Sequence, residues 1–316
     1  MSRFGTLAAL AAALIASGCR GDFSNAEAEE LASREQRLAA RLALATGDSS
    51  AAPLARWVLP PQLLEISGLA LTTDGNLLAH NDEHPLISVI DPRRGVVLKQ
   101  FGFGERGLRG DFEGIAVAGG EIFLLVSNGK IYRFREGEDG DKVPHTIIDT
   151  KLGKECEFEG IAIDAAGVII LSCKNLGKGA PKDQMLFYRF DPKTAQASPL
   201  AIPYSDAIGS NGWKELNPSD VTIEPSTKNY VVIAAQEKAL IELTPDGRVV
   251  RTGTLPDQPR QAEGVAIGDG IIYVSDEGSA EPATISLYRW PLPAIGETAD
   301  SVTASNEPAQ RLENVR

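Results

Sequence analysis

The chain has 316 residues, of which 43% are hydrophobic and 23% are charged, a balance typical of a folded globular protein rather than a disordered one. Its 31 basic and 43 acidic residues give a net charge of -12. This charge argues against a nucleic-acid partner, because such a partner requires a basic surface that neutralises phosphates. An acidic balance suits cations or cationic ligands, and it serves plain solubility equally well.

Residues 1–19 have the pattern of an export signal. Arg3 precedes an apolar stretch from Phe4 to Ile15, which is too short to span a bilayer and is followed by small residues. Because the small residues run directly into Cys19, we expect a lipoprotein-type signal that ends at a lipidated Cys19. Ordinary secretory cleavage and an uncleaved anchor are the alternatives. The expected location is the bacterial cell envelope, with the lipid in the outer membrane and the protein facing the periplasm, since Arg rather than Asp follows the cysteine.

Residues 20–55 are predicted to form a helical stalk and linker. The run from Asn25 to Gly47 is rich in Ala, Glu, Leu and Arg, with Asn25 available as a cap and Gly47 as a terminator. Its leucines are too few for a coiled coil, so a spacer is favoured over a partner-binding helix. The polar tail over 293–316 is predicted to be disordered.

A short phrase then recurs five times along the chain. The copies read EISGLA, DFEGIA, FEGIAID, NPSDVTI and QAEGVAI, at intervals of about 44 to 60 residues, and such spacing indicates a repeat architecture. The residue that precedes the glycine, or its equivalent, differs between copies. These five residues are Ser67, Glu113, Glu159, Ser219 and Glu263.

Each repeat reads as four short strands joined by tight turns, except the fifth, which lacks its last strand. A strand near Arg56–Leu59 lies before the first repeat and could fill that vacancy, which would close a ring and hide both sheet edges. The sequence therefore predicts an all-β fold over residues 56–292, a five-bladed β-propeller of four-stranded blades closed by an N-terminal strand. The recurring glycines would lie where the innermost strands converge and leave no room for a side chain.

The same phrases, together with the strand endings HNDE, AAQE and VSDE, resemble the SdiA-regulated, YjiK-like family of bacterial envelope proteins. The resemblance runs from Trp57 to Trp290. It implies a five-bladed propeller distantly similar to NHL-repeat proteins, with calcium bound in one member and no established reaction. This chain departs from the usual acidic strand endings at Ser127-Asn128 and Cys173-Lys174.

In a propeller, the residues before the glycines form a ring at one mouth of the axial channel. Glu113, Glu159 and Glu263 would converge there, and we expect Asp82, Glu237 or Asp276 to join them from the ends of the second strands. Converging carboxylates repel one another unless a cation compensates, and an oxygen-rich ring suits Ca²⁺. The alternative is that the acids pair with local bases or position the blades by hydrogen bonds. The candidate bases are Lys174, Lys238, Arg106 and Arg109.

The cluster from His80 to His84 combines two histidines with two carboxylates, so a transition-metal site or a general base is conceivable. Pro85 favours a solvated turn instead. No GxSxG, HExxH, Walker or CxxC motif occurs in the sequence. Two functions remain open, a monomeric calcium-binding module for a small ligand or an envelope protein, and a calcium-dependent hydrolase of the lactonase or phytase-like kind.

Cys156 and Cys173 are predicted to form a disulfide. If Ile163 faces Val168 across the hairpin, Phe158 lies opposite Cys173, and Cys156 is then one pleat out of register. A small bulge would bring the two sulfurs together. Two buried free thiols are the alternative.

Overall fold

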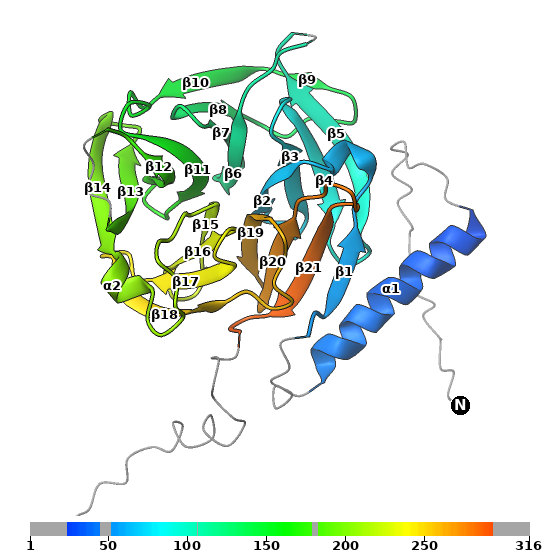
Figure 1. Ribbon diagram of the computed structural model, residues 1–316. Coiled ribbons are helices and arrows are strands. Elements are labelled where there is room, and N and C mark those ends of the chain that lie inside the picture. The colour runs from blue at the N-terminus through cyan, green and yellow to red at the C-terminus, as the bar shows by residue number, and fades with distance from the viewer. Residues whose placement is uncertain (1–23, 45–51, 106, 179–182, 293–316) are drawn as a thin grey trace, which may run out of the picture.

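The computed structural model describes residues 24–44, 52–105, 107–178 and 183–292. Over these ranges the chain folds into five sheets arranged as a ring around a central axis (Figure 1). The predicted five-bladed β-propeller is therefore confirmed. The signal segment with Cys19 and the tail over 293–316 lie outside the described residues, so what was expected of them stays a prediction.

The blades follow one another along the chain, and each begins with the repeated phrase as its innermost strand. Blade one contains β2 (Ile66–Leu71), β3 (Leu77–Asn81), β4 (Leu86–Asp91), β5 (Val96–Phe103) and the short parallel β9 (Lys142–Val143). Blade two contains β6 (Phe112–Ala118), β7 (Glu121–Val126), β8 (Lys130–Phe134) and β10 (His145–Asp149). Blade three contains β11 (Cys156–Ile163), β12 (Ile169–Leu176), β13 (Gln184–Asp191) and β14 (Gln196–Pro203).

Blade four contains β15 (Asp220–Ile223), β16 (Tyr230–Ala234), β17 (Ala239–Leu243) and β18 (Val249–Thr254). Blade five contains β19 (Ala262–Gly268), β20 (Ile271–Asp276), β21 (Thr284–Arg289) and, from the other end of the propeller, β1 (Ala55–Val58). Because β1 pairs antiparallel with β21, the ring is closed as expected. The helices are α1 (Asn25–Ala43), α2 (Tyr204–Ala207) and the single 3-10 turn η1 (Pro61–Leu63).

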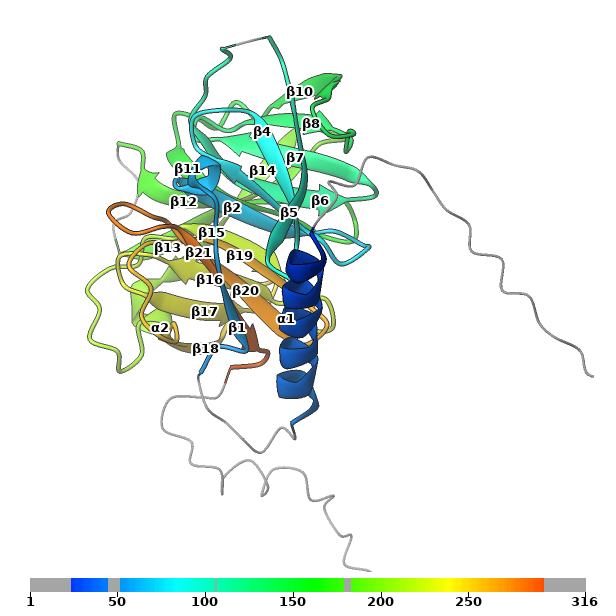
Figure 2. The same cartoon turned by 90° about the vertical axis from the view of Figure 1, so that its right-hand side faces the viewer.

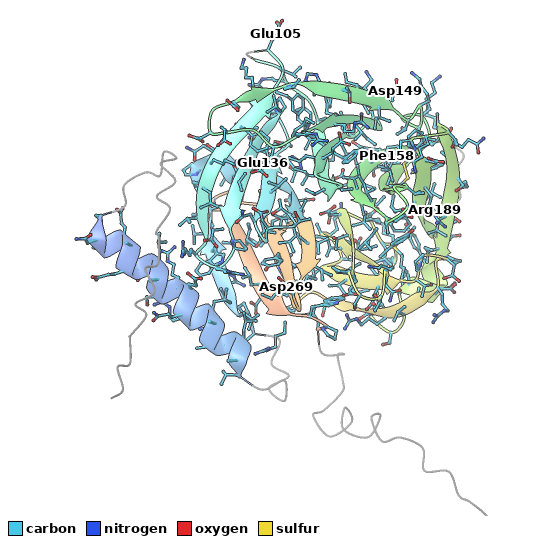
Figure 3. All side chains as sticks on the ribbon, turned by 180° about the vertical axis from the view of Figure 1, so that it is seen from behind. Glu105, Glu136, Asp149, Phe158, Arg189 and Asp269 are labelled. Atoms are coloured by element: carbon cyan, nitrogen blue, oxygen red, sulfur yellow. A yellow bond between two sulfur atoms is a disulfide. The ribbon has the colours of Figure 1, made fainter. Side chains whose placement is uncertain are left out.

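The core lies between neighbouring blades, where apolar side chains of adjacent sheets pack face to face. Viewed from behind, the side chains fill the spaces between the sheets, with Phe158 inside the ring and Asp149 near its outer edge (Figure 3). Phe158 is fully buried. Within the described residues, no helix combines the length and the apolar character needed to cross a bilayer.

The recurring glycines, which four of the five innermost strands carry, let these strands approach their neighbours closely. A Cβ atom on Gly114 would lie 2.8 Å from the carbonyl oxygen of Glu159, and one on Gly160 would lie 2.7 Å from the backbone nitrogen of Val221. Such distances are too short for a real side chain, so glycine is required for steric reasons, as the sequence suggested. We call this level of the propeller the glycine ring.

Helix α1 packs on the side of the propeller next to β1, in both views of the ribbon (Figures 1 and 2). Its Leu38 is only 4% exposed, and Glu35 forms a 2.9 Å ion pair with Arg94. Ser24 rather than Asn25 caps the helix, through a reciprocal bond with Glu27. The helix is therefore docked on the propeller, and its role as a spacer stays a prediction. Sequence reasoning counted leucines for a coiled coil, whereas one buried leucine and several polar contacts suffice to dock a helix on a preformed surface.

Cys156 and Cys173 form a disulfide that joins β11 to β12, with their Cα atoms 5.7 Å apart. Phe158 lies opposite Cys173, as expected. At the hairpin end the pairing differs from the predicted one by one residue, because Ile163 pairs with Ile169 rather than with Val168. A bulge in β11 accounts for the difference.

Candidate functional site

The repeated glutamates occupy β-bulges at the beginnings of the innermost strands. In β6, Phe112 pairs with Val126 and Gly114 with Leu125, which leaves Glu113 as the extra, unpaired residue. The same shift leaves Glu159 unpaired in β11 and Glu263 unpaired in β19. A bulge redirects a side chain out of the normal alternation of a strand. Repetition of the glutamate thus reflects repetition of the bulge, and we call this end of the axis the glutamate mouth.

Glu113 and Glu159 form a hydrogen-bonded carboxyl pair at this mouth. Burial, and then the charges of Glu159 and Asp111, raise the pKa of Glu113 to about 9. The raised pKa favours a proton on Glu113 rather than on Glu159 within this pair. Burial raises the pKa of Glu159 as well, although Lys174 opposes this shift.

Lys174 is the base that faces this pair. Its Nζ lies 3.0 Å from Oε1 of Glu159, whose side chain is only 5% exposed. Burial lowers the pKa of Lys174, but the negative charges of Glu159, Glu263 and Glu113 outweigh that effect and raise it overall. The ammonium therefore stays charged, and the expected alternative of pairing with a local base is correct for Glu159.

Glu263 and Glu277 extend the acidic cluster toward blade five. Burial raises the pKa of Glu263 to about 7, against the influence of Lys174. Burial and the charges of Glu263 and Asp82 raise the pKa of Glu277 to about 7. Both groups therefore hold their protons more strongly than exposed glutamates do, and the mouth holds more carboxyl groups than it has positive charge to balance.

Asp220 is a fully buried carboxyl group that the sequence analysis missed. It stands in blade four where the other blades have glycine, and it accepts hydrogen bonds of 2.8 Å from the backbone N–H groups of Val265 and Val221. Burial raises its pKa well above the usual value. It binds the free edge of β19 and so connects blades four and five. An aspartate at a glycine position of the repeat was the available signal.

The acidic residues predicted at the ends of the second strands do not all reach the mouth. Asp82 is near it, since its charge acts on Glu277, and burial raises the pKa of Asp82. Asp276 instead accepts a 2.8 Å bond from the backbone N–H of Gln261. Glu237 is held by Asn217, whose side-chain amide donates to it at 3.0 Å.

The residue predicted from blade five, Asp276, is therefore one position away from the residue that lies at the mouth, which is Glu277. Gly264 pairs with Ser275 and Ala262 with Asp276, so the bulge at Glu263 shifts the pairing on one strand only. A shift of one residue exchanges the faces on which neighbouring side chains lie. The bulge cannot be placed from the sequence alone, which explains the displacement.

The histidines at 80 and 84 do not form a joint site. His80 belongs to β3 and is fully buried, with Nδ1 2.9 Å from the carbonyl oxygen of Asn81. Burial lowers its pKa to about 4, so it is neutral at neutral pH. His84 is in the following bend, 3.7 Å from Glu83. The expected solvated turn is correct for His84 and wrong for His80.

The donors at the glutamate mouth are carboxylate oxygens, which is the ligand chemistry that Ca²⁺ requires. Within the ranges that the structure describes, no three His, Cys, Asp or Glu side chains already stand in an arrangement that could hold a metal ion. The ammonium of Lys174 already contacts one of these carboxylates, that of Glu159. The residues fit Ca²⁺ by chemistry, provided that Glu159 exchanges the ammonium for the ion.

The raised pKa of Glu113 predicts an unusual pH dependence of the free energy of unfolding. In the absence of divalent cations, the contribution of Glu113 to the free energy of unfolding should be fully present below its unfolded pKa of 4.5 and should be lost as the pH rises through about 9, because the folded state binds a proton that the unfolded state releases. Glu113→Gln needs no proton, so it should be more stable than the wild type at about pH 8 and should lack this part of the pH dependence. Urea unfolding of both proteins at several pH values measures this difference. Equal slopes against pH would show that the glutamate is ionised in the folded state.

A second compartment lies on the same axis beyond the glycine ring. It is a cavity of about 540 Å³, lined by innermost-strand residues that follow the glycines, such as Ile115, Ile161 and Val221. None of the three repeated glutamates lines it. The glutamate mouth is therefore a separate site from this cavity.

No family model matches the chain, and no match was found among curated proteins. Among solved structures, the glutaminyl cyclase of Myxococcus xanthus is similar with a TM-score of 0.51 at 12% identity, over 75% of this chain and 95% of that chain. A luciferin-regenerating enzyme has a TM-score of 0.49 at 11% identity, over 77% and 97% of the two chains. A streptogramin B lyase has a TM-score of 0.41 at 17% identity, over 76% and 73%. At 12% identity the likeness to the cyclase supports the propeller fold alone, and the resemblance to the SdiA-regulated family stays a prediction.

Proposed function

We propose that this protein is a propeller of the bacterial cell envelope whose glutamate mouth binds Ca²⁺ and presents the surrounding face to a small ligand or an envelope protein. The observation that carries the proposal is the position of Glu113, Glu159 and Glu263 at three equivalent bulges, with Glu159 in contact with Lys174 and the other two acting on the same ammonium by charge. The resemblance to the SdiA-regulated family implies bound calcium as well, whereas the choice of these glutamates comes from the repeat itself.

The charge balance of the mouth supports a divalent ligand. Six carboxyl groups lie in or beside it, and Lys174 faces them. These carboxyl groups are Asp82, Asp111, Glu113, Glu159, Glu263 and Glu277. In the ion-free protein, bound protons neutralise part of the excess negative charge, as the raised pKa values of Glu113 and Glu263 indicate. A hard dication neutralises the same excess more strongly, because its attraction to each carboxylate scales with its charge.

Calcium is therefore expected to stabilise the wild-type protein. At about 100-fold excess over the dissociation constant, binding to the folded state adds about 2.7 kcal/mol to the free energy of unfolding. Glu159→Gln keeps size and hydrogen-bonding capacity but removes the central charge, so it should lose most of this gain. Thermal unfolding with and without CaCl₂, together with titration calorimetry, measures the effect.

Glu237→Gln is the matched control, because Glu237 bonds to Asn217 away from the mouth. It should respond to calcium as the wild type does. If chelator leaves the wild-type midpoint unchanged and calorimetry detects no binding, the glutamates serve only as an ion-pair network. Adding lactone and phosphoester substrates to the calcium-loaded protein tests for hydrolysis in the same samples.

The envelope location is proposed from the sequence pattern that ends at Cys19. Cys19→Ser should leave the fold unchanged, because the propeller begins far along the chain from this residue. It should also release the protein from the membrane fraction into the soluble envelope fraction. A variant that stays with the membrane would point to an uncleaved helix or a bound partner as the anchor.

A further inference from the structure

Lys174 occupies a position that is acidic in two other blades. Cys173 pairs with Phe158 as Asn81 pairs with Ile66 and Asp276 with Ala262. The residues that follow these partners are therefore equivalent. They are Lys174 in blade three, Asp82 in blade one and Glu277 in blade five.

The lysine side chain is directed into the acidic cluster rather than into solvent. Its relative exposure is 29%, and its ammonium forms the 3.0 Å ion pair with Glu159. Glu263 and Glu113 also act on it, so the three repeated glutamates from blades two, three and five share one positive charge. Asp82, Asp111 and Glu277 add further negative charge around them.

We propose that Lys174 is the resident cation of the glutamate mouth and that it makes the mouth selective for divalent over monovalent ions. This inference rests on the proposed binding of Ca²⁺ at the same site. In the ion-free protein the ammonium compensates Glu159, and an incoming ion must displace it.

A monovalent ion that displaces the Lys174 ammonium brings no additional positive charge to the glutamate mouth. The ammonium is tethered to the site, so its effective concentration is high, and Na⁺ or K⁺ in solution carries the same single charge. Ca²⁺ carries twice the charge and binds several oxygens at once, so it can outcompete the lysine. Without the lysine, the carboxylates have no internal counter-ion and accept either kind of ion.

The test compares wild type, Lys174→Met and Lys238→Met. Methionine keeps much of the length of lysine and removes its charge. Lys238 is the matched control, since it follows a second strand in blade four and, within the part of the chain that the structure describes, makes no ion pair. Thermal midpoints are recorded against CaCl₂, and separately against NaCl with choline chloride holding the ionic strength constant.

We expect calcium but not sodium to raise the midpoint of the wild type and of Lys238→Met. Lys174→Met should bind calcium about tenfold more tightly by calorimetry, and sodium should now raise its midpoint. If Lys174→Met is too unstable to purify, Lys174→Gln removes the same charge while keeping a polar side chain, and its midpoint should respond to sodium.

The outcomes separate the two proposals. Suppose that the wild type binds calcium, that Lys174→Met binds it no more tightly, and that sodium does not change the midpoint of Lys174→Met. The proposed role of Lys174 is then overturned, while calcium binding stands. If neither protein binds calcium, the proposed function fails, and the inference fails with it.

Discussion

Replacing Cys156 and Cys173 together by alanine should lower the free energy of unfolding by about 3 kcal/mol. The two cysteines are separated by 17 residues in sequence, so the crosslink limits the conformations of a loop of that size in the unfolded chain. Both side chains are also buried between blades two and three, at 4% and 2% exposure. Urea unfolding, analysed by linear extrapolation, measures the loss.

Alanine is preferable to serine here, because a buried hydroxyl without a partner would add its own penalty. Wild type treated with a reductant is the control and should unfold at nearly the same urea concentration as the double variant. If the oxidised and reduced wild type unfold alike, and if labelling of the unfolded, non-reduced chain finds two thiols, the bridge is absent in solution.

The repeat determined how much of the fold could be predicted. Each copy of the phrase carries its own strand pattern and turn residues, so the blades could be counted before the structure was known. The closing strand was also predictable, because the fifth repeat lacks a strand and an unpaired apolar segment precedes the first. These features are local or periodic, and periodic features can be recognised in a single sequence.

The details of the site depend on features that a single sequence does not show. The bulges at Glu113, Glu159 and Glu263 follow from how two strands pair, and they decide that Glu277 rather than Asp276 lies at the mouth. Lys174 was visible as a candidate base, but its contact with Glu159 depends on the bulge in the pairing of β11 with β12 within blade three. Helix α1 was predictable as a helix, whereas its docking beside β1 depends on tertiary contacts between polar groups.

Deletion of the closing strand should have the largest effect of all. A chain that begins at Pro61 lacks β1, so it exposes the edge of β21 and the apolar surface that Leu54 and Leu59 cover. Leu54 is 7% and Leu59 is 6% exposed in the intact protein, and each fully buried side chain of this kind is worth about 1.5–3 kcal/mol. Added to the lost strand pairing, the sum approaches the whole stability of a typical domain, about 5–15 kcal/mol. We expect no cooperative thermal transition, and association through the open edge of β21.

A chain that begins at Pro53 distinguishes ring closure from helix docking. It lacks α1 but retains β1, so it should fold as a monomer with a lower thermal midpoint, since only the contacts of Leu38 and its neighbours are lost. A synthetic peptide spanning 53–60, added to the chain that begins at Pro61, should restore a cooperative transition by occupying the edge of β21. Circular dichroism during heating and light scattering after size exclusion measure both properties. If the chain that begins at Pro61 folds cooperatively as a monomer without the peptide, four strands in blade five are not needed to hold the ring closed.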